Sequence, residues 1–176
     1  MGEGVISLSR KSQRKRVMQL PYTFRNVSRQ LTEQDIRAFE EERGISLPQS
    51  YRALLLSVNG GYPKNEGYYY GDGKSFMLQR LYPLTDEVES YFNLRSKNHP
   101  TCDAPKGFLI IGASSFGDSV CLGVDPPYAG KVIYLDHEER DPDEIEENDW
   151  LGVYVLADSF ELFMSSLQDE WAKLKS

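Results

Sequence analysis

The chain has few of the residues that disulfide bonding, metal binding and catalysis use most often. Its 176 residues include two cysteines and two histidines. So few cysteines cannot build the disulfide framework of a small secreted protein, so we expect reduced thiols and a cytoplasmic location. Apolar runs are short, as in the four residues from Phe108 to Ile111, whereas a membrane-spanning helix needs roughly 18. We therefore expect no membrane partner.

The start of the chain also lacks the apolar stretch of a secretory signal peptide, because its basic cluster is followed by no such run. Residues 1–30 hold seven basic residues and one acid, a sum of +6. The net charge is −7, so the rest of the chain carries −13. An acidic body repels nucleic acid and attracts basic partners. We predict a basic N-terminal extension over 1–28, either solvated or phosphate-binding, and a single domain over 29–176.

Complete catalytic motifs are missing as well. The sequence contains no Gly-x-Ser-x-Gly, no P-loop and no His-Glu-x-x-His. His99 and Cys102 are three residues apart, but in a polar loop that offers no third group to orient them. A zinc site needs further ligands, and Cys121 is far along the chain in a predicted strand. We assign no catalytic, cofactor-binding or metal-binding residue, and we predict that the protein is not an enzyme.

Two short helices are predicted near the start of the domain. The first covers 33–43, with Thr32 as its N-cap and Gly44 at its end. The second covers 48–58. Its single apolar stripe consists of Tyr51, Leu54, Leu55 and Val58. Helices of this length are marginal alone in water, so we expect a helical hairpin held together by packing.

The second helix is followed by Asn59-Gly60-Gly61, residues that tolerate the left-handed conformation of a helix end. A glycine pair can also cradle phosphate, but phosphate-binding loops precede a helix, whereas these glycines follow one. We therefore interpret the three residues as a helix stop.

The rest of the chain alternates short apolar runs with turns, which predicts a sheet. A short helix is expected over about 85–94, a loop over 93–106 and a final helix over 159–174. The expected strands lie near 68–70, 76–78, 107–113, 119–124, 132–136 and 153–156. Short connections favour antiparallel pairing. The predicted fold class is α+β, a mainly antiparallel sheet packed by the N-terminal helical hairpin and the C-terminal helix.

Five motifs follow one another in an order that resembles the SUKH superfamily, over about residues 31–171. The motifs are Leu31 to Ile36, Gly44 to Pro48 with Tyr51 to Gly61, Ile110-Ile111-Gly112 with Gly117-Asp118, Gly130 to His137, and Leu156 to Phe163. The resemblance implies a SUKH-like fold and a protein-binding module. The commonest bacterial role in that superfamily is an immunity protein that neutralises a toxin domain, often a nuclease.

Two functions from this resemblance stay open. A nuclease that grips phosphates is basic, so an acidic immunity protein would attract it and block its nucleic-acid path. The fungal relatives imply instead a regulatory scaffold for cellular partners, which the basic extension also fits. A hydrolase has the least support.

The sharpest functional candidate is a run of nine acids and one base, Arg140, within residues 136–149. An EF-hand is disfavoured, because Ile145 and Glu146 stand where that motif needs an oxygen ligand and a glycine. The run is either a solvated loop or a surface that docks a basic toxin domain, with Trp150 as an aromatic anchor. The predicted partner-binding residues are Asp136, Glu138, Glu139, Asp141, Asp143, Glu144, Glu146, Glu147, Asp149 and Trp150.

Overall fold

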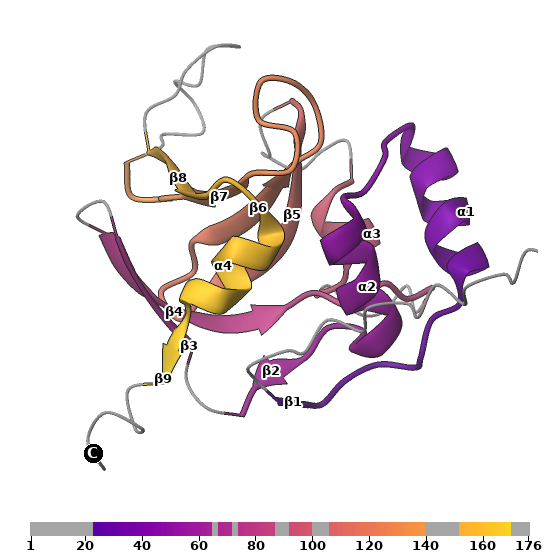
Figure 1. Ribbon diagram of the computed structural model, residues 1–176, viewed down its shortest axis with the longest axis horizontal. Helices are drawn as coiled ribbons and strands as arrows, with labels where there is room; N and C mark the ends of the chain where they lie inside the picture. The colour runs from indigo at the N-terminus through magenta and orange to yellow at the C-terminus, as the bar shows by residue number, and fades with distance from the viewer. Residues whose placement is uncertain are drawn as a thin grey trace, which may run out of the picture.

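The computed structural model describes residues 23–64, 67–71, 74–86, 92–99, 106–139 and 152–169. The helices there are α1 (Glu33–Arg43), α2 (Gln49–Ser57), α3 (Leu94–Lys97) and α4 (Phe160–Ser166). The strands are β1 (Phe24–Arg25), β2 (Tyr62–Pro63), β3 (Gly67–Gly71), β4 (Lys74–Leu81), β5 (Phe108–Ser114), β6 (Ser119–Gly123), β7 (Val132–Leu135), β8 (Val153–Ala157) and β9 (Gln168–Asp169). In Figure 1, α4 lies across the sheet while α1, α2 and α3 gather at one end.

Seven strands form one sheet in the order β8-β7-β6-β5-β4-β3-β9. Neighbouring strands pair antiparallel throughout, which confirms the predicted α+β class. The separate pair β1–β2 places Arg25 opposite Tyr62. Because β1 lies inside the stretch assigned to the N-terminal extension, at least these two residues pack on the domain. The division at residue 28 stays a prediction.

Helix α1 begins and ends at residues that cap it. The Thr32 hydroxyl accepts from the Asp35 backbone N–H (3.2 Å), and the Asp35 carboxylate accepts from the Thr32 N–H (2.7 Å). At the other end Gly44 has φ of 64°, a conformation that costs glycine little. The Arg29 guanidinium, 2.9 Å from Asp35, holds the pKa of that carboxyl well below its usual range. The helix therefore has the predicted bounds.

One arginine ties α1 to α2. Arg52 donates to Glu33 at 2.8 Å and also to Glu40, and the bond to Glu40 is the main reason that the Arg52 pKa is raised. Glu40 accepts in addition from the backbone N–H of Leu47 (2.8 Å). The predicted helical hairpin is confirmed, and α2 differs from its prediction by one residue at each end.

The glycines after α2 serve packing rather than helix capping, which corrects the predicted helix stop. The helix ends at Ser57, and Val58 is already extended, with φ of −143°. Gly60 has φ of 70°, and a Cβ there would lie 2.5 Å from the backbone nitrogen of Pro83. Only glycine fits this close approach without displacing backbone.

Two asparagine side chains bond to distant backbone in the manner of a neighbouring strand. The buried Asn59 amide donates to the carbonyl oxygens of Arg29 (3.0 Å) and Leu84 (2.9 Å) and accepts from the Leu84 N–H (2.8 Å). Asn98 donates to the Ile110 carbonyl (2.8 Å) and accepts from the Ile110 N–H (2.6 Å). Both satisfy backbone groups that would be costly to leave without a partner.

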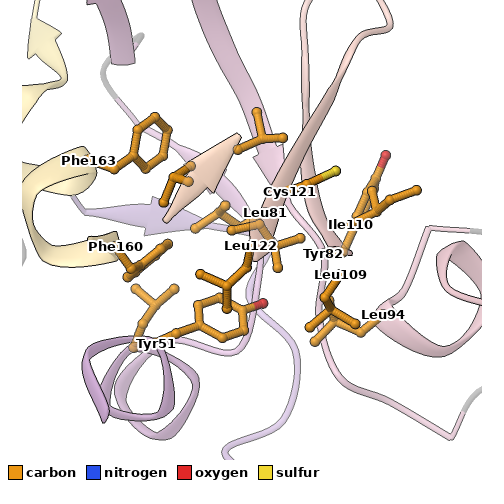
Figure 2. Close-up of a cluster of buried hydrophobic side chains, with 14 of the residues drawn as sticks. Tyr51, Leu81, Tyr82, Leu94, Leu109, Ile110, Cys121, Leu122, Phe160 and Phe163 are labelled. Atoms are coloured by element: carbon orange, nitrogen blue, oxygen red, sulfur yellow. The ribbon is translucent and has the colours of Figure 1, made fainter. Parts of the chain in front are cut away.

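The core lies on both faces of the central strands, and every residue of β5 is buried. Figure 2 shows Tyr51 and Phe160 on one side of these strands and Leu94 and Leu109 on the other. The rings of Tyr51 and Phe160 meet edge to face at 5.0 Å. The residues predicted to be buried are all at most 5% exposed: Tyr51, Leu54, Leu55, Phe160, Phe163 and Leu167.

The predicted final helix over 159–174 is too long. Helix α4 ends at Ser166, and Leu167 is extended, with ψ of 136°. The hydroxyls of Ser165 and Ser166 donate to carbonyls three residues earlier, so these carbonyls do not need a further helical turn. The next residues form β9, whose backbone pairs with β3 instead. Of the predicted stripe, Trp171 and Leu174 lie outside the described residues.

The predicted short helix over about 85–94 is corrected only at its two ends, because residues 87–91 lie outside the described residues. Thr85 and Asp86 are not helical, and α3 begins only at Leu94, inside the stretch that we predicted as a loop. Its start is set by Asn93, which accepts from the backbone N–H of Arg95 (2.8 Å) and Ser96 (2.9 Å). An asparagine three residues before a serine is a capping signal that the sequence already contained.

Candidate functional site

The turn between β5 and β6 has a fixed shape because Ser114 and Asp118 bond across it. The Ser114 N–H donates to the Asp118 carbonyl (2.9 Å). The Ser114 hydroxyl oxygen accepts from the backbone N–H of Phe116 (3.1 Å) and Asp118 (3.2 Å). Gly117 takes φ of 99° within the turn, which favours glycine. The result is a preformed turn with the Phe116 side chain 75% exposed.

The buried carboxylate of Asp118 joins this turn to β7. Its Oδ2 accepts from the Ser114 hydroxyl (2.8 Å) and from the Tyr134 hydroxyl. Its Oδ1 lies 2.7 Å from Nδ1 of His137, a distance that fits an Nδ1–H donor, and 3.3 Å from the His137 backbone nitrogen. We call Ser114, Asp118, Tyr134 and His137 the Asp118 network.

The network shifts the pKa values of its members in the directions that its hydrogen bonds require. Burial alone would raise the pKa of Asp118, but the donors Tyr134, Ser114 and His137 outweigh burial and lower it. The bond to Asp118 raises the pKa of His137. Burial and the same carboxylate raise the pKa of Tyr134. At neutral pH Asp118 is therefore ionised, and it favours the protonated imidazolium.

The network offers neither a nucleophile nor a free set of metal ligands. The buried Ser114 hydroxyl donates to Asp118, and His137 contacts Asp118 rather than Ser114. Asp118, Asp136 and His137 place one possible ligand atom each within 4.8 Å of one another. However, both Asp118 oxygens and His137 Nδ1 are already bonded, and Asp136 Oδ1 accepts from the Glu138 N–H (3.0 Å). The geometry fits a structural role that fixes the turn and the end of β7.

The acidic run begins directly at the Asp118 network, as residues 136–139 follow β7. The Asp136 N–H donates to the Gly152 carbonyl (2.9 Å), and Glu139 accepts from the Tyr154 hydroxyl (2.5 Å). Glu138 is exposed. These three predicted partner-binding acids therefore share one end of the sheet. The others lie outside the described residues: Asp141, Asp143, Glu144, Glu146, Glu147, Asp149 and Trp150.

The turn with Phe116 and the start of the acidic run are neighbours. His137, whose side chain is 55% exposed, links the two through Asp118. A Cβ on Gly117 would lie 3.8 Å from Cε1 of His137. The turn that carries the exposed Phe116 thus lies next to His137, the residue between Asp136 and Glu138. This combination was not predicted, because only the strand order brings residues 116 and 137 together.

The residues weighed for a reactive thiol give no catalytic arrangement in the part of the chain that the structure describes. Cys121 is buried in β6, where a thiol behaves as a small apolar side chain. His99 is exposed after α3, and Cys102 lies outside the described ranges. The Cys–His hypothesis therefore gains no support.

The order of elements and motifs matches a known family. The model of the SMI1 / KNR4 family (SUKH-1) matches residues 30–166. The chain belongs to the SMI1/KNR4 family. The match spans α1 to α4 and contains the whole Asp118 network, and it confirms the SUKH resemblance. Comparison with curated proteins gives no match, and comparison with solved structures gives none either.

Membership in the SMI1/KNR4 family makes the chain a protein-interaction module in general terms. None of the helices among the described residues is long and apolar enough to cross a bilayer. The Phe116 turn and His137, which stands between the acids Asp136 and Glu138, are both held by the Asp118 network.

Proposed function

We propose that this chain is an immunity protein that binds and neutralises a basic toxin domain of the nuclease kind. The observation that carries the proposal is the acidic run over 136–149. Its first residues are anchored to the domain, because His137 bonds to the buried Asp118 carboxylate. Family membership supports a protein partner. The charge of −13 outside the first 30 residues supports a basic one.

In this proposal the mechanism is occlusion without catalysis. A nuclease presents basic side chains along the path of its nucleic acid. The acids from Asp136 to Asp149 take the place of phosphates there, and Phe116 and Trp150 supply apolar contact at the centre. Opposite charges speed the encounter of the partners, and buried aromatic anchors slow their separation. We expect the purified chain to lack nuclease, protease and esterase activity.

The experiment measures binding to the product of an adjacent toxin gene, with association and dissociation rates followed separately. Glu146→Gln with Glu147→Gln should slow association, because rim charges act mainly on that rate. Neutralising Asp141, Asp143 and Glu144 as well should slow it further and flatten its dependence on salt. Exposed charges contribute little to folding, so thermal stability should stay within about 0.5 kcal/mol of the wild type.

A matched control keeps the result specific. Glu41 and Glu161 are exposed acids on α1 and α4. Glu41→Gln with Glu161→Gln removes the same charge as the first variant and should leave the association rate unchanged. If both pairs slow association equally, the net charge and not the acidic run attracts the partner. If neither does, the acidic run is a solvated loop.

A regulatory scaffold is the second candidate, favoured by the basic extension. Residues 1–30 carry +6, which a toxin-neutralising role does not require. A scaffold would bind cellular partners and would have no toxin gene beside its own. Reading the neighbouring genes separates the two proposals.

A further inference from the structure

Cations and aromatic rings alternate across a face built from β1, β2, β4 and the segment around α3. The guanidinium carbon of Arg80 lies 4.8 Å from the ring centre of Tyr62 and 4.3 Å from that of Phe92. Arg25 lies 6.0 Å from the Tyr62 ring, and the Lys97 ammonium lies 5.1 Å from the Phe92 ring. We call these five residues the cation–aromatic row. It is assembled only by the fold, because its members come from separate elements.

The Arg80 guanidinium lies over the rings of Tyr62 and Phe92, a position that keeps its terminal nitrogens available to a ligand. Its Nε donates to Gln79 at 3.3 Å. No acid pairs with Arg80 in the described part of the chain. In Arg52, by contrast, each terminal nitrogen forms a salt bridge, one with Glu33 and the other with Glu40. Stacked rings fix the plane of a guanidinium, and its terminal N–H groups then form a fork that matches a carboxylate.

The surroundings of the row have the composition of a protein interface. Among the described residues, the exposed large apolar side chains are Val27, Phe92, Phe116 and Leu162. Phe92 belongs to the row. Val27 lies beside it, since a Cβ on Gly61, the residue before Tyr62, would be 3.1 Å from Val27 Cγ1. Arginine, tyrosine and phenylalanine are enriched at protein interfaces, and exposed apolar groups beside them favour a protein partner.

We propose that the cation–aromatic row docks an acidic segment of a partner protein, at a site separate from the acidic run and opposite to it in charge. The basic residues of the N-terminal extension precede β1 in the sequence, and β1 contributes Arg25 to the row. A nucleic acid would need open ring faces for its bases. Arg80 covers one face of Tyr62 and one of Phe92.

The test uses the full chain and a short labelled peptide of glutamate and leucine, with fluorescence anisotropy as the measurement. Arg80→Lys keeps the charge but loses the fork and the stacking plane, and we expect roughly tenfold weaker binding. Arg37 is exposed on α1, and Arg37→Lys is the matched control, for which we expect no change. Lys97→Gln leaves the contacts of Arg80 with the Tyr62 and Phe92 rings in place and should weaken binding about threefold.

Four results would overturn the proposal. The first is peptide binding that Arg80→Lys and Lys97→Gln both leave unchanged, in variants whose urea midpoints match the wild type. The second is tighter binding of a single-stranded RNA of similar length. The third is self-association that Arg80→Lys abolishes, which would make a second copy the occupant. The fourth is much tighter peptide binding after Glu87→Gln with Glu89→Gln, which would mean that the chain's own acids occupy the fork.

Discussion

Replacing Asp118 by alanine tests whether the Asp118 network holds the β5–β6 turn to β7. The substitution leaves the hydroxyls of Ser114 and Tyr134 without their acceptor, and these residues are 1% and 6% exposed. A buried donor without a partner costs about 1–3 kcal/mol. Removing a desolvated carboxylate returns part of that cost. We expect Asp118→Ala to lower the free energy of unfolding by about 3 kcal/mol.

Urea denaturation followed by circular dichroism measures this loss, and a double substitution shows its cause. In the wild type, Tyr134→Phe removes a hydrogen bond and should cost about 1 kcal/mol. In the Asp118→Ala background it removes a stranded hydroxyl, so it should restore about 1 kcal/mol instead. Asp125 is an exposed acid in the next turn, and Asp125→Ala should change the unfolding free energy by less than about 0.5 kcal/mol. Additive effects of the two network substitutions, or a loss below about 1 kcal/mol for Asp118→Ala, would refute the reasoning.

Three further substitutions have expected outcomes. The Tyr51 hydroxyl is buried with no hydrogen-bond partner among the described residues. Tyr51→Phe should therefore raise the free energy of unfolding by about 1 kcal/mol, measured as a higher urea midpoint; a lower midpoint would contradict this. The bond to Asp118 raises the pKa of His137 above its usual 6.5, so its contribution is complete below that value and is lost as the pH rises through the folded pKa. The stability difference between wild type and His137→Gln should therefore shrink as the pH rises above about 6.5 and through the folded pKa, and a constant difference would show that the charge plays no part. A Cβ on Gly112 would lie 2.5 Å from the Arg80 carbonyl oxygen, so Gly112→Ala should lower the free energy of unfolding by about 2 kcal/mol in a thermal melt. An unchanged melting temperature would show that β4 and β5 can move apart at no cost.

The helical hairpin could be predicted because its signals are local. Thr32 and Gly44 set the ends of α1 through residues three or four positions away, and a reader of the sequence sees both. The end of α4 could not be predicted in this way. The apolar spacing of Phe160, Phe163 and Leu167 continues past Ser166, but β3 offers backbone partners that a helix cannot use. Pairing between segments about 100 residues apart decides where the helix ends.

The candidate site was predictable only in part for the same reason. The acidic run is visible in the sequence because its members are adjacent. Asp118 and Tyr134 are 16 residues apart, and their contact depends on the register that places Val120 opposite Tyr134. The resemblance to the SUKH superfamily included Gly117-Asp118 and Gly130 to His137 but not the bonds between them. The cation–aromatic row had no local signal, because Arg25 and Lys97 meet the same row from distant segments.

Asn98 closes the connection between α3 and β5 at its base, because one side-chain amide takes both backbone groups of Ile110. These two bonds fix α3 relative to β5, so a change in the length of the connection should not move either element. Doubling the length of a flexible loop costs only about 0.6 kcal/mol in closure entropy. Related chains should be able to gain or lose residues between Asn98 and Gly107, ahead of the buried strand β5, and keep the same sheet. The connection is thus a place in this fold where evolution, or a protein engineer, can insert a new recognition loop at little expense to the core.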